Sequence, residues 1–270
     1  MADWRFYAVR GPLTAHYYGL EPSLAITDGA WLIDLLPEWR APREKTGAPV
    51  FVPHWTSAIY GDWRAPAEMA GMTYVNPLDD GPSVLERIAS ARLVVTESLH
   101  GAIFADYFRT PWVPVSSAGR ILAFKWVDWC MSVDLDYESY ELPPSDWVDF
   151  LFQGQRPTRG LAPIASRRWN AEEFNVIPSR QANLRASPLY RAKVVAKDWG
   201  RQARDAGIEW LRGRRDNALM RRWNAARREE LAGRLSALAA LGGTLSADAA
   251  RERRLSQLAE ALERMRAEEG

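Results

Sequence analysis

Residues 92–103 read Arg-Leu-Val-Val-Thr-Glu-Ser-Leu-His-Gly-Ala-Ile and join an apolar segment to a helix-forming one. Residues 92–96 are apolar and β-branched without polar alternation, which is typical of a strand buried in a parallel sheet. A helix is predicted at about residues 99–107, and the Arg-Thr-Pro sequence at 109–111 ends it. The turn at Ser98 is therefore predicted to lie at the carboxyl end of a buried strand, where open α/β sheets bind ligands.

Similar segments occur on both sides of this stretch. Further strands are predicted at residues 49–53, 72–76 and 112–115. A helix is expected after the strand at 72–76, with Ser83 as its N-cap and Glu86 completing a capping box. The alternation of strands and helices predicts an α/β fold, namely a doubly wound domain with a parallel, Rossmann-like sheet.

The composition changes near residues 160–180. Residues 180–228 carry fourteen basic residues against four acidic ones, and helices are predicted at residues 196–215, 217–241 and from Ser246 onward. The expected organisation is an α/β domain at residues 1–160 and a basic, mainly helical C-terminal extension at residues 161–270. This extension is predicted either to pack on the body or a partner, or to rest on an anionic membrane surface.

The bulk composition excludes several kinds of site. The 35 basic and 34 acidic residues nearly cancel, so nucleic acid is not an expected partner. A single cysteine, Cys130, rules out an internal disulfide and a cysteine-based zinc site. No P-loop, dinucleotide-binding or zinc-protease motif occurs, so neither a metal nor a cofactor is predicted.

Without a run of about 18 apolar residues, the chain is expected in the cytoplasm, at most peripheral to the inner face of the membrane. The thirteen tryptophans are expected to fill the core, or else to stack on sugar rings.

The turn after the strand at residues 92–96 carries the candidate chemistry. The helix that begins near Ser98 and Leu99 offers free backbone N–H groups, which hold phosphate well. Gly101 permits close approach of a ligand, and His100 can donate to a phosphate oxygen or move a proton near neutral pH. The alternative is that His100 makes only a local hydrogen bond at the helix N-terminus.

Three blocks in this order resemble the polysaccharide pyruvyl transferase family. Residues 7–14 resemble its Val-Arg-Gly-Pro-x-Thr block, the Ser-Leu-His-Gly turn at 98–101 resembles its central motif, and residues 120–126 resemble a later segment that carries a lysine. Asp28 stands in an Asp-Gly pair where the family usually has Asp-Pro, and His54 has a counterpart in the exopolysaccharide branch. The turn is similar to that of the ketal pyruvate transferases of succinoglycan and xanthan assembly.

The resemblance implies an activity and a set of site residues. Arg10, His100 and Lys125 would contact the phosphate and carboxylate of phosphoenolpyruvate, the donor substrate, with His100 as general acid or phosphate partner. His54 is a candidate for contact with the acceptor, a lipid-linked oligosaccharide, and Asp28 would shape either the site or only the turn. The product would be a pyruvate ketal on a sugar of an exopolysaccharide repeat unit.

The resemblance also implies an architecture. The α/β domain would correspond to the C-terminal half of a glycosyltransferase B-type fold, and most of the family's N-terminal half is expected to be absent. The alternatives are therefore a truncated, non-catalytic interaction module, whose basic tail docks on a membrane or a biosynthetic complex, and a glycosyltransferase that uses a sugar nucleotide. For single residues, Arg10 could simply cap the turn before Gly11, and Lys125 could lie over Trp126.

Overall fold

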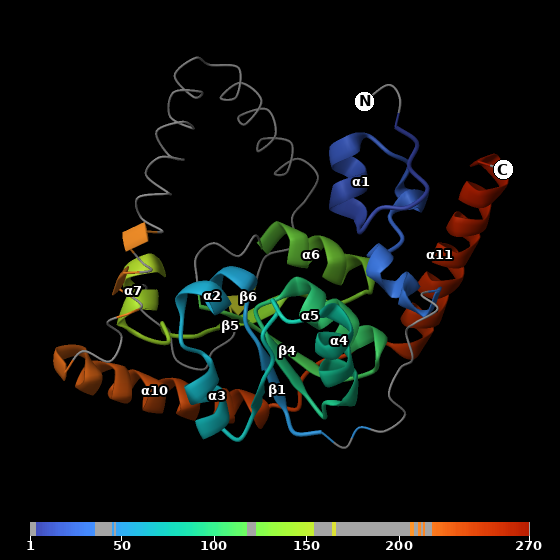
Figure 1. Cartoon of the computed structure of the whole chain (residues 1–270). Helices are drawn as coiled ribbons and strands as arrows, with labels where there is room; N and C mark the ends of the chain where they lie inside the picture. Colours follow the sequence, from blue (N-terminus) through green and yellow to red (C-terminus); the bar gives the residue numbers. More distant parts are fainter. Residues whose placement is uncertain are drawn as a thin grey trace, which may run out of the picture.

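The computed structural model describes residues 4–35, 45, 47–117, 123–153, 164–165, 206–207, 210–211, 213 and 218–269. Its strands form one sheet in the order β2-β1-β3-β4-β5-β6, in which the first five are parallel and β6 is antiparallel to β5 (Figure 1). The strands are β1 Val50–Val52, β2 Thr73–Tyr74, β3 Val94–Thr96, β4 Trp112–Ser116, β5 Glu138–Glu141 and β6 Ile164–Ala165.

Helices flank this sheet on both sides, which confirms the predicted doubly wound, Rossmann-like class. They are α1 Pro12–Tyr18, η1 Pro22–Leu24, η2 Gly29–Leu35, α2 Trp55–Tyr60, α3 Arg64–Met69, α4 Gly81–Ser90, α5 Leu99–Tyr107, α6 Ala123–Ser132, α7 Trp147–Gln153, α10 Ala218–Ala239 and α11 Asp248–Glu269. All four predicted strands are present, whereas β5 was not predicted because its Glu-Ser-Tyr-Glu sequence lacks an apolar pattern.

The N-cap predicted for the helix α4 was wrong. The side chain of Asp80, not Ser83, caps this helix and accepts a hydrogen bond from the backbone N–H of Ser83 at 3.3 Å. Pro82 then occupies the first turn, where a missing N–H costs nothing and the fixed φ suits the helix. Ser83 therefore lies inside the first turn of α4.

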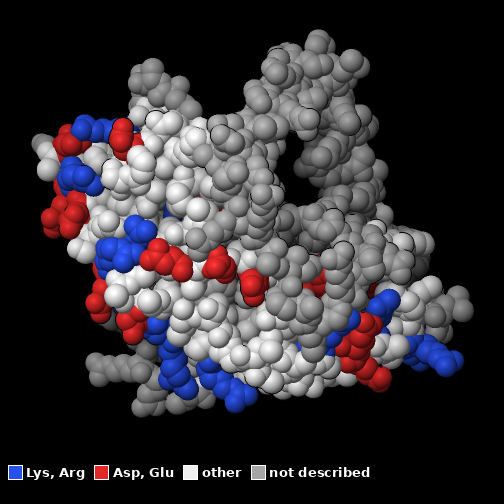
Figure 2. Space-filling view, turned by 180° about the vertical axis from the view of Figure 1, so that it is seen from behind, with Lys and Arg blue, Asp and Glu red and all other residues white. Residues whose placement is uncertain are grey.

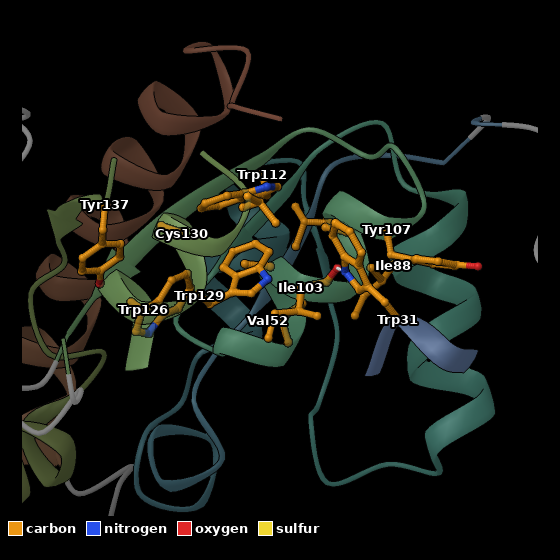
Figure 3. Close-up of a cluster of buried hydrophobic side chains, with 14 of the residues drawn as sticks. Trp31, Val52, Ile88, Ile103, Tyr107, Trp112, Trp126, Trp129, Cys130 and Tyr137 are labelled. Carbon is orange, nitrogen blue, oxygen red and sulfur yellow. Dashed lines mark hydrogen bonds between the residues drawn. The ribbon is translucent and has the colours of Figure 1, made fainter. Parts of the chain in front are cut away.

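The first face of the sheet is covered by α4, α5 and α6 and holds a tryptophan-rich core. Four of its tryptophans are at most 2% exposed, namely Trp31, Trp112, Trp126 and Trp129. The Trp112 and Trp129 rings are tilted by 45° with centroids 5.4 Å apart, and Trp126 stacks on Tyr137 with centroids 5.1 Å apart. Figure 3 shows this cluster of rings. Core filling is thus confirmed for these residues, although Trp4 and Trp55 are largely exposed.

The second face of the sheet is covered by α3 and α10. Phe51, Val95, Val113 and Val115 point to this face because side chains alternate along each strand. The completely buried α10 residues that cover them are Leu231, Leu235 and Leu238. The helix predicted at residues 217–241 is therefore confirmed and is a layer of the α/β body.

The helix α11 returns to the first face and lies beside the N-terminal segment (Figure 1). The connection between α10 and α11 is anchored by Asp106, a buried carboxylate that accepts hydrogen bonds from the Trp112 indole N–H at 3.0 Å and the Ser246 backbone N–H at 2.8 Å. The backbones of Trp112 and Thr244 also pair. Both C-terminal helices are thus fixed to β4.

The predicted division near residue 160 stays a prediction, because residues 154–163 lie outside the described part. The same holds for most of the basic segment and of the helix at 196–215. Figure 2 shows acidic and basic side chains interspersed on the described part of the face seen from behind, without a large patch of one sign. Among the described helices, none has the length and apolar character needed to cross a membrane.

Because α10 is the second layer of the fold, we predict that Leu235→Ala lowers the free energy of unfolding by about 2–5 kcal/mol, the usual cost of a buried leucine cavity. Denaturant unfolding followed by circular dichroism measures this change. Leu241→Ala makes the same substitution at a side chain that is 52% exposed, and it should cost less than about 1 kcal/mol. Equal effects of the two substitutions would contradict the role given to α10.

Candidate active site

The topology of the sheet indicates where a ligand is expected to bind. From β1 the chain runs to β2 on one side, whereas β3 leads to β4 on the other, so the strand order reverses between β1 and β3. Ligands of open α/β sheets bind outside the carboxyl ends of the strands at such a switch point. The residues that follow these two strands are His54 after β1 and residues 97–101 after β3, which are the segments predicted from the sequence.

The turn after β3 is held by local hydrogen bonds. Ser98 is the N-cap of α5, and its hydroxyl accepts from the Gly101 backbone N–H at 3.3 Å. The Thr96 hydroxyl accepts from the Ser98 N–H and donates to the Val52 carbonyl, each at 2.9 Å. The first N–H groups of α5, at Leu99 and His100, have no acceptor within the helix and remain for an anion.

The helix α5 approaches β3 so closely that position 101 tolerates no side chain. A Cβ atom on Gly101 would lie 2.6 Å from the Thr96 hydroxyl oxygen, which is itself fixed by three hydrogen bonds. The sequence predicted a close approach at Gly101. In the structure, the partner that approaches Gly101 is Thr96 of the strand β3. Its effect is to set the position of the helix N-terminus.

The structure brings Arg10, Asp28 and His100 together. The Arg10 Nε donates to Asp28 at 2.8 Å, and the His100 Nε2 lies 4.0 Å from the other oxygen of this carboxylate. Asp28 also accepts from the Ala30 backbone N–H at 3.0 Å, so its orientation is fixed at the start of η2. The His100 side chain is 61% exposed. A cation and an imidazole therefore face solvent beside the first turn of α5.

A second carboxylate, Asp128 of α6, positions the block that contains Arg10. It accepts from the backbone N–H groups of Leu13 at 2.8 Å and Thr14 at 3.1 Å, at the N-terminus of α1. A Cβ atom on Gly11 would lie 2.0 Å from the Asp128 carbonyl oxygen, which explains the glycine. Burial raises the pKa of Asp128 above its usual value, and the hydrogen bonds from the Thr14 hydroxyl and the two backbone N–H groups, with the charge of Arg10, only partly offset this rise. The sequence signal for Asp128 was a lone acid among apolar neighbours.

Glu97 is the residue that sequence reasoning most clearly missed at the switch point. Its side chain is buried, and it accepts from the Ser117 backbone N–H at 2.6 Å and from the His54 N–H at 3.1 Å. The ends of β1, β3 and β4 are thereby tied to one carboxylate. An acid directly after an all-apolar strand is rarely buried without such donors, and this pattern was visible in the sequence.

The two remaining candidate residues are His54, which follows β1, and Lys125 of α6. His54 Nδ1 lies 2.7 Å from the Thr56 hydroxyl and accepts from the Thr56 backbone N–H at 3.4 Å. The backbone contact favours the neutral tautomer that carries its proton on Nε2. Burial and the nearby charge of Lys125 lower the pKa of His54, whereas Glu97 raises it. Lys125 is exposed on α6. Within the described residues, no hydrogen bond or ion pair joins it to Arg10 or His100, and residues 120–122 of its block are outside them.

The described residues contain no group of three or more His, Cys, Asp or Glu side chains that could hold a metal ion. The free Cys130 is buried in the core, and burial raises the pKa of its thiol. The groups with chemistry near the switch point are Arg10, His54, His100 and Lys125, together with backbone N–H groups and the hydrogen-bonded carboxylates Asp28, Glu97 and Asp128. Such a set can bind an anion and move protons.

Comparisons with known proteins bear on this site. Residues 73–119, which contain the strand β3 and the turn, match the model of the polysaccharide pyruvyl transferase family. The chain is 40% identical over 154 residues to the succinoglycan biosynthesis protein ExoV of Rhizobium meliloti (strain 1021). This alignment covers 57% of the chain and 48% of that protein, so the chain spans about half the length of the relative. No solved structure matches.

The tight packing of α5 on β3 predicts that Gly101→Ala lowers the free energy of unfolding by about 1–3 kcal/mol, because the methyl group overpacks against Thr96. Thermal unfolding of the purified protein measures this loss. Gly233→Ala, in the exposed interior of α10 with open space around it, should instead add about 0.5–1 kcal/mol. A stabilising Gly101→Ala would refute the close contact.

The role of Glu97 predicts that Glu97→Gln lowers the free energy of unfolding by about 1–3 kcal/mol. The amide would place N–H groups against the donors of His54 or Ser117, and one of these would lose its partner. Denaturant unfolding measures the effect, with Glu86→Gln on the exposed face of α4 as a neutral control. If both variants match the wild type, the three strand ends are not tied by this carboxylate.

Proposed function

We propose that this chain belongs to the polysaccharide pyruvyl transferase family, whose model matches its residues 73–119, and that it transfers a pyruvate ketal from phosphoenolpyruvate to a sugar of an exopolysaccharide repeat unit. The single observation that carries the proposal is the meeting of Arg10, Asp28 and His100 beside the first turn of α5 at the switch point. In this proposal, the acceptor is a lipid-linked oligosaccharide, met by the protein at the cytoplasmic face of the membrane.

The donor suits the electrostatics of this corner. Phosphoenolpyruvate is a small trianion at neutral pH, and a helix N-terminus with adjacent cations favours phosphate. Asp28 accepts a hydrogen bond from the Nε of Arg10 and so orients the guanidinium. Its two terminal nitrogens make no hydrogen bond within the described residues. They can therefore bind a phosphate or carboxylate with two parallel hydrogen bonds. Lys125 would supply a further positive charge from the side of His54.

The proposed reaction balances in atoms and charge. The methylene carbon of phosphoenolpyruvate takes up a proton and becomes a methyl group, and the neighbouring carbon becomes an oxocarbenium-like centre. Two hydroxyls of one sugar attack that carbon, and the C–O bond to phosphate breaks. Of the two hydroxyl protons, one replaces the proton used at the methyl group and the other leaves with phosphate. The steps need an acid near the methylene group and groups that orient the hydroxyls.

The site residues can be assigned to these tasks. His100 is exposed at the α5 N-terminus and would protonate carbon or hold the phosphate. His54, whose lowered pKa favours the neutral ring with a proton on Nε2, would donate a hydrogen bond to an acceptor hydroxyl. Asp28 and Glu97 do not react in this proposal; they hold Arg10 and the strand ends in place.

The proposal predicts that His100→Gln lowers the rate of ketal formation by about 10²–10⁴-fold, the usual contribution of a positioned acid or base. Phosphate release and the mass gain of the acceptor sugar measure the rate with phosphoenolpyruvate and a lipid-linked repeat unit. His16→Gln is the matched control, because His16 is exposed on α1 and outside the proposed site. An unchanged rate in His100→Gln would remove this histidine from the mechanism.

The same assay distinguishes the two other functions. Calorimetric binding of phosphoenolpyruvate without turnover would indicate a non-catalytic module, and no binding at all would contradict the donor. Sugar transfer from a sugar nucleotide, measured on the same acceptor, would indicate a glycosyltransferase.

A further inference from the structure

A groove runs between the N-terminal segment and the helix α11. Its walls are residues 4–10, the Leu32 side chain of η2 and the Leu262 and Met265 side chains of α11, and its volume is about 470 Å³. This volume lies within the range of small-molecule sites, about 300–1,000 Å³. Figure 1 shows the N-terminal segment and α11, the two walls, side by side at the edge of the molecule. This space is called the N-terminal groove below.

Aromatic rings form one wall of the N-terminal groove and continue beyond it. Trp4 is 73% exposed and stacks on Phe6 with centroids 6.3 Å apart, and Phe6 stacks on Tyr18 of α1 at 5.6 Å. Tyr18 in turn meets Tyr17 edge to face at 4.9 Å. A large exposed aromatic surface with a polar rim marks a binding surface. The flat apolar face of such a ring can stack against the C–H face of a pyranose ring.

The charged groups of the N-terminal groove are neutralised in pairs. Arg5 and the Tyr7 hydroxyl both reach Glu268 of α11, each at 2.6 Å, and Arg10 pairs with Asp28. At the other end of the groove from Arg10, the cation that lines the aromatic wall is Arg5, which is paired with Glu268. This part of the groove therefore does not select an anion such as a lipid phosphate or an acidic membrane surface. Its polar rim would instead serve a neutral ligand with many hydroxyl groups, and its aromatic wall would serve that ligand's apolar faces.

The N-terminal groove is continuous with the candidate active site. Arg10 and Asp28 line the groove and also meet His100 at the first turn of α5. A ligand lying along the aromatic wall would therefore end beside Arg10, the residue proposed to bind phosphoenolpyruvate. The lipid of a lipid-linked acceptor is separated from its terminal sugar by the remaining sugar units, so sugars rather than lipid belong this close to the reacting carbon.

We propose that the N-terminal groove binds the neutral sugar units of the acceptor that adjoin the reacting sugar, with Trp4 and Phe6 as stacking surfaces and α11 as the opposite wall. This inference rests on the proposed function. It assigns to the N-terminal segment and the last helix, both outside residues 73–119, the task of presenting the acceptor to the donor.

The test uses neutral β-linked glucose and galactose tetrasaccharides as probes, with binding followed by saturation-transfer NMR and calorimetry on the full chain. Trp4→Ala is expected to weaken binding by about tenfold or more, as truncation of a central aromatic contact does. Leu262→Trp, which fills the groove from α11, should weaken it similarly. Trp210→Ala, at an exposed tryptophan that does not line the groove, should leave it unchanged. Circular dichroism checks that each variant folds.

The outcomes separate this inference from the proposed function, because phosphoenolpyruvate binding is measured on the same samples. Loss of sugar binding in Trp4→Ala and Leu262→Trp with retained phosphoenolpyruvate binding supports the groove. No tetrasaccharide binding, or equal binding in Trp4→Ala, overturns it while the donor proposal stands. Sugar binding without phosphoenolpyruvate binding keeps the saccharide site and overturns the donor.

Two further measurements exclude other occupants of the N-terminal groove. If Trp4→Ala keeps sugar binding but loses co-sedimentation with phosphatidylglycerol–phosphatidylcholine vesicles, the groove contacts a membrane and the inference is overturned. If Trp4→Ala keeps sugar binding but changes the oligomeric state in sedimentation velocity, the groove binds a second copy, which also overturns the inference.

Discussion

A carboxylate buried in an apolar sheet needs hydrogen-bond donors, and the way Glu97 obtains them determines the geometry of the site. Its donors lie at the ends of neighbouring strands: the backbone N–H of His54 after β1, and the backbone N–H and hydroxyl of Ser117 after β4. The carboxyl ends of β1, β3 and β4 are thereby held beside one another at the point where the strand order reverses. The next residue, Ser98, is the N-cap of α5, so the helix end that we propose to bind phosphate is positioned by the same carboxylate.

The site also depends on segments far from its central turn. Arg10 reaches the turn because Asp128 of α6 holds the start of α1 and Asp28 holds the guanidinium. The second face of β3 and β4 is covered by leucines of α10, such as Leu235. Residues 73–119 match the family model, but the leucines that bury one face of their strands come from α10, and the cation beside their turn is Arg10 of the N-terminal segment.

The part of the fold that could be predicted from the sequence is the part encoded locally. The strand β3 and the helix α5 follow from β-branched runs and a Ser-capped turn. The cap of α4 was misjudged because Asp80 and Ser83 are both good caps, and the proline between them favours the earlier start. The positions of α10 and the hydrogen bonds of Glu97 depend on contacts across the sheet, which local patterns do not contain.

The proposed function requires a phosphate site at the first turn of α5, flanked by Arg10 and His100. The most direct measurement is a crystal structure of the chain with phosphoenolpyruvate. We predict that the phosphate or carboxylate lies within hydrogen-bond distance of the Arg10 guanidinium and the His100 ring, with an oxygen at the N–H groups of the first turn of α5. Density for the ligand elsewhere, with the Arg10–Asp28 pair unchanged and no anion at this turn, would contradict the account.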